Sequence, residues 1–338
     1  MASLQEIRAK LKEQENRASG ASLGGDNSIF PFWNMAEGQT STIRFLPDAD
    51  NNNTFFWVER LMIKLPFAGI KGETDSRPVQ VQVPCMEMYG ESCPILTEVR
   101  TWFKDPSLED MGRKYWKKKS YIYQGFVVSS DMKEDTVPEN PIRRFIIGPQ
   151  IFKLVKQALL DPDLESIPTD YTSGLDFRLT KGSKGGFADY STSSWARRER
   201  PLSDSEMKAV NQFGLFNLKD FLPKRPNDVE LKVLTEMFEA SVDGEPYDKD
   251  RWGQYFKPAG MGSSTGDPGA VGESTKKSAN AGSSMPNKAR TLVEDEDDEI
   301  PFKAEPAPAP TKQEAPKPVA SNNAQDILAM IRARQNKQ

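Results

Sequence analysis

The sequence concentrates cationic and aromatic side chains in residues 113–123, which read RKYWKKKSYIY. Five of the first seven positions are Lys or Arg, the other two are aromatic, and none is acidic. Cations neutralise a row of phosphates with release of counterions, and aromatic rings stack on unpaired bases whatever the base. The stretch therefore predicts a sequence-tolerant surface for single-stranded nucleic acid. The alternative is a solvated basic loop that leads into a strand with half-buried tyrosines.

A second stretch, residues 177–200, has the same chemistry. A strand pattern leads into a loop rich in Lys and Gly, whose glycines allow backbone to approach a ligand closely, and aromatic and Arg residues follow. Residues 113–200 contain 16 Lys/Arg against 11 Asp/Glu, whereas the whole chain has a net charge of -4. Because the local field steers a charged ligand, the acidic total does not argue against a polyanionic partner.

Composition narrows the class of protein. No apolar run approaches membrane-spanning length, and the N-terminal residues lack the layout of a secretory signal, so we expect a soluble intracellular protein. Cys85 and Cys93 are then expected to be reduced thiols. Histidine is absent, which removes the commonest general base and metal ligand and favours a protein that is not an enzyme.

The elements that position these residues are mainly short strands. Alternating or apolar runs between turn residues predict strands at 42–47, 55–61, 79–83, 121–128, 142–147 and 175–179. Helical spacing predicts helices at 94–103, 149–160 and 229–238. The expected fold class is mainly β with inserted helices, in a small and partly open β-barrel.

The remaining chain divides by composition. Residues 1–22 form an N-terminal arm with an amphipathic helix at 3–17, and residues 23–258 form the folded core. Gly, Ser, Thr and Ala dominate 259–293, which predicts a flexible linker. An acidic and Pro/Ala-rich tail, 294–338, follows and ends in a second amphipathic helix. The two terminal helices share a pattern, QEI near one end and QDI near the other, although chance similarity explains it equally well.

Three motifs in residues 40–200 resemble the single-stranded DNA-binding (helix-destabilising) proteins of T-even-type bacteriophages. They are IRFLP at 43–47, KKKSY at 117–121 with the strand that follows, and GFADY at 186–190. The resemblance implies an OB-fold core with DNA in a cationic cleft, an arm for cooperative self-association on DNA, and an acidic tail that recruits replication and recombination proteins. It also implies a role in phage DNA replication, recombination and repair, in the cytoplasm of an infected bacterial host.

The candidate site residues follow from both arguments. The DNA-binding candidates are Arg113, Lys114, Tyr115, Lys117, Lys118, Lys119, Tyr121, Lys181, Lys184, Phe187 and Tyr190. The resemblance places the three consecutive lysines and Tyr121 in the cleft and gives Phe187 and Tyr190 a stacking role. The partner-binding candidates are Asp297, Asp298, Glu299, Ile300 and Phe302, which resemble the acidic tip of bacterial single-stranded DNA-binding proteins.

The chain departs from the phage family in two places. The family zinc site uses one His and three Cys, whereas only Cys85 and Cys93 are present here, and two thiolates do not complete a tetrahedral site. We therefore expect no metal cofactor. The arm also lacks a convincing copy of the family's basic-Ser/Thr motif. An RNA-binding or translational regulatory protein and, less favoured, a metal-dependent nuclease remain as alternative functions.

Overall fold

The computed structural model describes residues 28–134 and 137–258, and these combine a β-sheet with several helices, as the sequence predicts. The predicted arm, linker and tail lie outside the described residues. The described part of the predicted core divides into two compact units. The first contains residues 28–62, Lys118–Arg225 and 256–258, and the second contains Ile63–Lys117 and Pro226–Tyr255.

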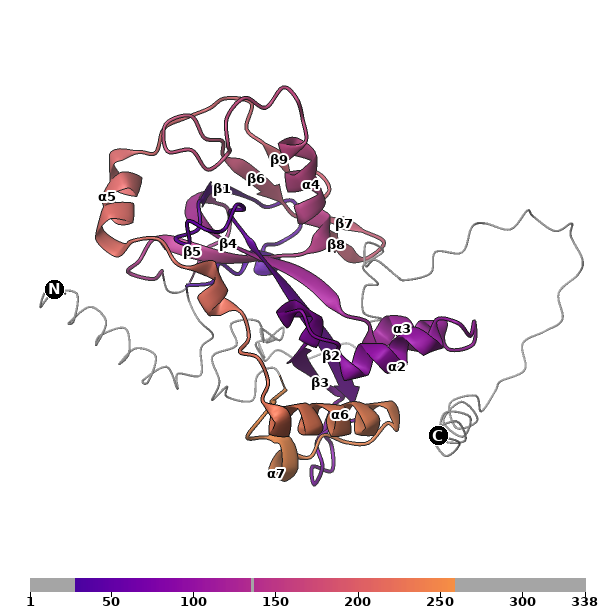
Figure 1. Ribbon diagram of the computed structural model, residues 1–338. Helices are drawn as coiled ribbons and strands as arrows, with labels where there is room; N and C mark the ends of the chain where they lie inside the picture. Colours follow the sequence, from indigo (N-terminus) through magenta and orange to yellow (C-terminus); the bar gives the residue numbers. More distant parts are fainter. Residues whose placement is uncertain (1–27, 135–136, 259–338) are drawn as a thin grey trace, which may run out of the picture. The chain divides into compact units, whose positions relative to one another are not determined.

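The first unit is built on antiparallel strands around β4 (Lys118–Ser130), the long strand labelled near the centre of Figure 1. β4 pairs with β1 (Thr40–Leu46), β2 (Val58–Phe67) and β5 (Ile142–Ile147). β6 (Phe177–Thr180) continues the sheet beside β1, and β9 (Ser194–Trp195) lies beside β6. The path from β3 to β9 does not return on itself, so the described strands form no closed sheet.

Side-chain alternation gives the sheet two distinct faces. Tyr121 and Tyr123 of β4 lie in one apolar cluster, whereas Ile122 and Phe126 lie in two others. Successive side chains of a strand point to opposite faces, which accounts for this division. We call the side with the two tyrosines the aromatic face.

Different helices cover the two faces. On the aromatic face, α4 (Pro149–Leu159) contributes Ile151 and Val155 to the cluster, together with Phe32 of η1 (Phe32–Asn34). On the other face, α5 (Asp204–Phe213) and η3 (Leu218–Phe221) pack through residues such as Ala209 and Leu218. The sheet of the first unit is therefore enclosed on both sides by apolar packing.

Arg44 of β1 is fully buried in the first unit and organises a charged network. Its guanidinium donates to the carbonyl oxygens of Asp170 and Arg200 at 2.7 and 2.9 Å, and lies 3.5 Å from the carboxylate of Asp176. Arg200 donates to Asp176 at 2.7 Å and to Glu206 of α5 at 2.8 Å. Burial raises the pKa of Glu206, but the hydrogen bonds and charge of Arg200 together with hydrogen bonds from Ser203 lower it overall, so this carboxylate stays ionised.

Two glycines leave room for Arg44. A Cβ at Gly174 would lie 2.4 Å from the Arg44 guanidinium, and a Cβ at Gly125 would lie 2.2 Å from the Arg44 carbonyl oxygen across the β1–β4 pair. Neither position can hold a larger residue without displacement of backbone or of the buried charge. Both glycines are therefore part of the packing around this residue.

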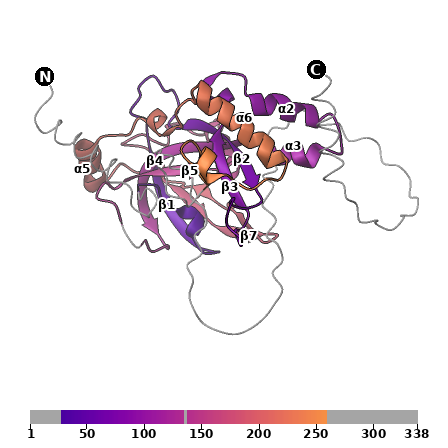
Figure 2. The ribbon, with the colours of Figure 1, turned by 90° about the horizontal axis from the view of Figure 1, so that it is seen from below.

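The second unit has its own aromatic core. It contains β3 (Val79–Pro84), η2 (Met86–Tyr89), α2 (Pro94–Trp102), α3 (Glu109–Tyr115), α6 (Asp228–Val242) and α7 (Lys249–Trp252). Trp102 of α2 stacks on Phe238 of α6 with ring centroids 5.8 Å apart, and Figure 2 shows these two helices side by side. Tyr115 packs edge-on against the same Phe238 at 5.5 Å.

Most predicted elements are present, with shifts at their ends. The strand expected at 142–147 has those bounds, and the helix expected at 149–160 ends one residue earlier. The strand expected at 55–61 begins at Val58 instead, and the one expected at 121–128 is longer at both ends. Helices α3 and α5 and the β7–β8 hairpin were not predicted. None of the helices among the described residues combines the length and apolar composition needed to span a bilayer.

The buried charge gives a first testable prediction. Arg44→Met leaves the Asp170 and Arg200 carbonyl oxygens without their donor, so it should lower the free energy of unfolding by about 3 kcal/mol. Urea denaturation measures this loss. Arg178→Met is the matched control, because Arg178 lies on neighbouring β6 with an exposed side chain. Equal effects of the two substitutions would contradict a stabilising role for the network.

Candidate nucleic-acid interface

The β7–β8 hairpin presents the most exposed of the predicted stacking residues. β7 (Gly182–Lys184) and β8 (Phe187–Asp189) pair with Lys184 opposite Phe187. The turn between them uses Gly185 and Gly186, with φ of +62° and +86°, a conformation that favours glycine. Phe187 is 38% exposed, and Lys184 is also exposed. The hairpin therefore places a ring and a cation side by side at the surface.

Helix α4 anchors the chain that follows the hairpin. The Gln150 side chain donates to the Asp189 carboxylate at 2.7 Å and accepts from the Tyr190 backbone N–H at 3.0 Å. The half-buried Tyr190 ring packs edge-on against Phe32, with centroids 5.7 Å apart. Burial raises the pKa of Tyr190 to about 12, so its phenol is neutral at physiological pH. The ring is thus held in place by the aromatic face while part of it stays accessible.

A second group of rings runs from the surface into the aromatic face. Phe55 is 57% exposed and stacks on Trp57 at 4.7 Å, and Trp57 in turn stacks on the buried Tyr123 at 5.7 Å. Phe152 of α4 packs edge-on against Trp57 at 5.5 Å and stacks on Tyr121 at 3.6 Å. Buried tyrosines therefore support the outer rings from below.

We call the accessible members of these two groups the aromatic rim. The rim also includes Trp33, which is half-buried and packs edge-on against Phe32 with centroids 5.5 Å apart. The rim therefore consists of Trp33, Phe55, Trp57, Phe152, Phe187 and Tyr190. The first turn of α4 joins its two halves, because Gln150 holds the segment with Phe187 and Tyr190 while Phe152 belongs to the other group. Half-exposed rings fixed by a rigid core offer bases a surface that is already ordered before binding.

The start of α4 adds a feature suited to phosphate. Its N-cap is Gly148, which makes no side-chain capping bond, and its first turn holds Pro149 and no acidic residue. By contrast, α5 and α6 each begin with a capping box closed by a Glu. The free backbone N–H groups and positive end of the α4 dipole favour an anion beside the rim.

The predicted lysines of the first unit differ in placement. Lys118 and Lys119 lie on β4 and are both half-buried. Alternation places Lys119 on the aromatic face with Tyr121, and Lys118 on the opposite face. The Lys181 ammonium donates a hydrogen bond to the Trp33 carbonyl oxygen. This partner is neutral, so the contact does not neutralise the lysine charge. Lys119, Lys181 and Lys184 are therefore the predicted cations that we expect to bind phosphates beside the aromatic rim.

Two of the DNA-binding candidates, both tyrosines, lie in the interior of the structure. Tyr121 is only 6% exposed and lies beneath Phe152 in the core of the first unit. Tyr115 is 1% exposed and donates its hydroxyl to the Ser241 carbonyl oxygen at 2.9 Å in the second unit. Both rings are core residues in this structure and offer no exposed face on which a base could stack.

The other predicted cations belong to the second unit. Arg113 pairs with Glu109 one helical turn earlier in α3, and the Lys114 Nζ lies 5.7 Å from the centre of the Tyr115 ring. The Lys117 Nζ donates to the Glu87 carboxylate at 2.7 Å. The Glu87 carboxylate also pairs with an Arg, and the two cations lower its pKa despite the opposing effect of burial. Lys117 is therefore already compensated by a carboxylate.

The two cysteines lie in the interior of the second unit. Cys85 and Cys93 are both fully buried and form no disulfide. The pKa of the Cys85 thiol is raised by its hydrogen bond to Cys93 and by burial. Among residues 28–134 and 137–258, no group of three or more potential ligands is placed together. Two thiols supply at most two of the four ligands that the zinc site of the phage family uses.

Four of the six residues of the aromatic rim, Trp33, Phe55, Trp57 and Phe152, are not among the sequence-based candidates. Phe55 and Trp57 fall in the strand predicted at 55–61, and Phe152 falls in the helix predicted at 149–160. The run FFW at 55–57 did contain a signal, because three consecutive large rings cannot all be buried on one side of a strand. The signal was not decisive, since strands also bury rings on both faces. The partner-binding candidates in the tail, Asp297, Asp298, Glu299, Ile300 and Phe302, lie outside the described residues.

Comparison with known proteins assigns no family to the chain. No family model matches the chain, and a search of curated proteins gives no match. The functional inference therefore rests on the aromatic rim, its neighbouring cations and the resemblance of the three sequence motifs.

The rim gives a prediction with a closely matched control. Phe187→Ala should weaken binding of a single-stranded oligonucleotide about 5- to 150-fold, which corresponds to about 1–3 kcal/mol of stacking. Phe213→Ala should leave affinity unchanged, because Phe213 is 37% exposed but lies on α5, on the opposite face of the sheet. Fluorescence anisotropy measures the affinity and thermal melting checks folding. A loss of affinity in both variants, or in neither, would contradict the rim.

Proposed function

We propose that the chain is a non-enzymatic protein that binds single-stranded DNA without strong sequence preference. The observation that carries this proposal is the aromatic rim, which sets accessible rings beside exposed or half-buried lysines and the uncapped start of α4. Rings of this kind recognise the face of any base, and cations recognise phosphates without reading sequence. The resemblance of three motifs to phage helix-destabilising proteins supports the same assignment.

Single strands suit this surface better than a duplex does. The rim offers ring faces, and a base can lie on a ring only when it is unstacked from its neighbours. In duplex DNA the bases stack on each other, so the rings would meet only the backbone and base edges. With this preference the protein coats single-stranded DNA and protects it.

The finer assignments extend from the resemblance. We propose that the sheet of the first unit is an OB-fold, and that residues 1–22 mediate cooperative self-association on DNA. The acidic tail recruits replication and recombination proteins through residues 297–302. The protein then acts in phage DNA replication, recombination and repair in the cytoplasm of the infected bacterial host.

A titration of the full chain tests the proposal. Oligomers of about 16 nucleotides, as single-stranded DNA, duplex DNA and RNA, are titrated at several salt concentrations. The single strand should bind at least about 10-fold tighter than the duplex, and its affinity should fall linearly on a logarithmic salt scale. Lys184→Ala should reduce the slope by about 0.7, the value for one phosphate contact of a single strand.

The control for this slope is Lys208→Ala on α5, an exposed lysine on the opposite face of the sheet. It should leave the slope unchanged. Equal or tighter binding to the duplex would overturn the proposal, and tighter binding to RNA would favour the RNA-binding alternative. Cleavage of any oligomer on addition of Mg²⁺ would favour the nuclease.

A further inference from the structure

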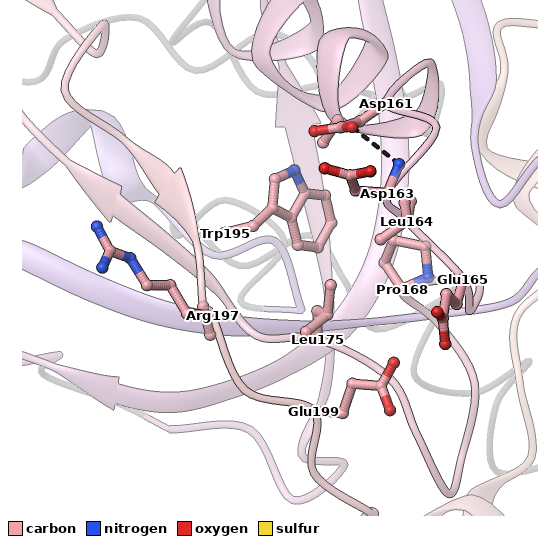
Figure 3. Close-up of a pocket in the computed structure, with 11 residues that line it drawn as sticks. Asp161, Asp163, Leu164, Glu165, Pro168, Leu175, Trp195, Arg197 and Glu199 are labelled. Atoms are coloured by element: carbon pink, nitrogen blue, oxygen red, sulfur yellow. Dashed lines mark hydrogen bonds between the residues drawn. The ribbon is translucent and has the colours of Figure 1, made fainter.

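A hollow of about 570 Å³ lies in the first unit, away from the residues assigned to the aromatic rim. It is lined by the end of α4, the loop after it, and the chain around β9. Trp195 forms one wall with Leu175 below it, as Figure 3 shows. The Trp195 indole N–H is buried and has no hydrogen-bond acceptor among the described residues. The hollow therefore has an aromatic wall.

The residues that line the hollow carry an excess of negative charge. Four carboxylates line it, from Asp161, Asp163, Glu165 and Glu199. No ion pair joins any of them to a cation within residues 28–134 and 137–258, and Figure 3 shows the guanidinium of Arg197 directed away from Asp161 and Asp163. Like charges gathered around a concave surface attract a cationic ligand.

Two exposed apolar residues directly precede, in the sequence, residues that line the hollow. Leu160 is 72% exposed and Ile167 is 65% exposed, and each adjoins residues that line it. Large apolar side chains exposed beside a pocket are typical of a surface that binds another chain. The loop that carries them is locally fixed, because the Asp163 N–H donates to the Asp161 side chain at 3.0 Å and the Leu164 N–H to the Asp161 carbonyl oxygen at 3.2 Å. The combination suits a segment that is apolar on one side and basic on the other.

We propose that this hollow binds residues 324–338 of the same chain. The sequence of that segment, AQDILAMIRARQNKQ, places Ile327, Leu328 and Ile331 on one side of a predicted helix. Its last eight residues contain three cations and no acid. The apolar side chains complement Leu160 and Ile167, the arginines complement the four carboxylates, and an Arg side chain can also lie over the Trp195 ring.

The length of the intervening chain permits this contact. Residues 259–323 provide 65 residues between the last described residue and the segment. A polar chain of that length has a root-mean-square span of about 45 Å, and tethering through it gives an effective concentration that favours binding within one molecule. The N-terminal arm is a weaker match because residues 1–17 contain four cations and three acids.

Photo-cross-linking of the full chain tests the proposal. With p-benzoylphenylalanine in place of Leu328, irradiation and mass spectrometry should find cross-links to peptides that contain residues 158–168 or 195–199. Asp161→Lys with Asp163→Lys should reduce the yield at least 5-fold. Adding Arg332→Asp and Arg334→Asp to that variant should restore most of the yield, because the attractive charge pattern is then reversed on both sides.

The matched control is Glu139→Lys with Asp220→Lys, which reverses two exposed acids of the first unit outside the hollow and should leave the yield unchanged. The yield should also be independent of protein concentration. Cross-links mainly to other regions, or a yield that charge reversal does not change, would overturn the proposal. A yield that rises with concentration would show that a second copy supplies the segment and would equally overturn it.

Discussion

The first unit depends on the burial of one charge, the guanidinium of Arg44. This side chain has no exposure to water, and its partners come from the chain around residues 170–176 and from the segment that enters α5. Satisfying it requires Asp176, Arg200 and Glu206 to lie together, and it requires glycine at 174. A buried charge left without partners is strongly destabilising, so these distant segments are fixed relative to β1.

That constraint separates the two faces of the sheet. Charged and polar groups such as Arg44 and Gln124 occupy the side covered by α5, where Gln124 bonds to the backbone of Phe216. The aromatic face is thereby left to rings and aliphatic side chains, which extend to its margin as Trp57, Phe152 and Tyr190. The proposed binding surface is thus the exposed margin of a core, and its rings need little reordering when a base arrives.

The sequence was sufficient where a local pattern decides the outcome. The strand pattern at Ile142–Ile147 and the helical spacing after Pro149 both predict their elements nearly to the residue. The sequence was insufficient where tertiary packing decides whether a side chain is buried or exposed. Nothing local distinguishes Tyr115, which bonds to Ser241 and is buried, from an exposed ring beside basic residues. Ser203 and Glu206 form a capping box at the start of α5. This spacing of residue types is a signal for the start of a helix that the sequence does contain.

The central claim is that nucleic acid lies along the aromatic rim. Ultraviolet cross-linking of the full chain to an oligothymidylate, followed by mass spectrometry of the linked peptides, tests it most directly. The account predicts adducts on peptides that contain Trp57, Phe152, Phe187 or Tyr190. Adducts confined to peptides that contain Phe213 or other residues on the α5 side of the sheet would contradict it.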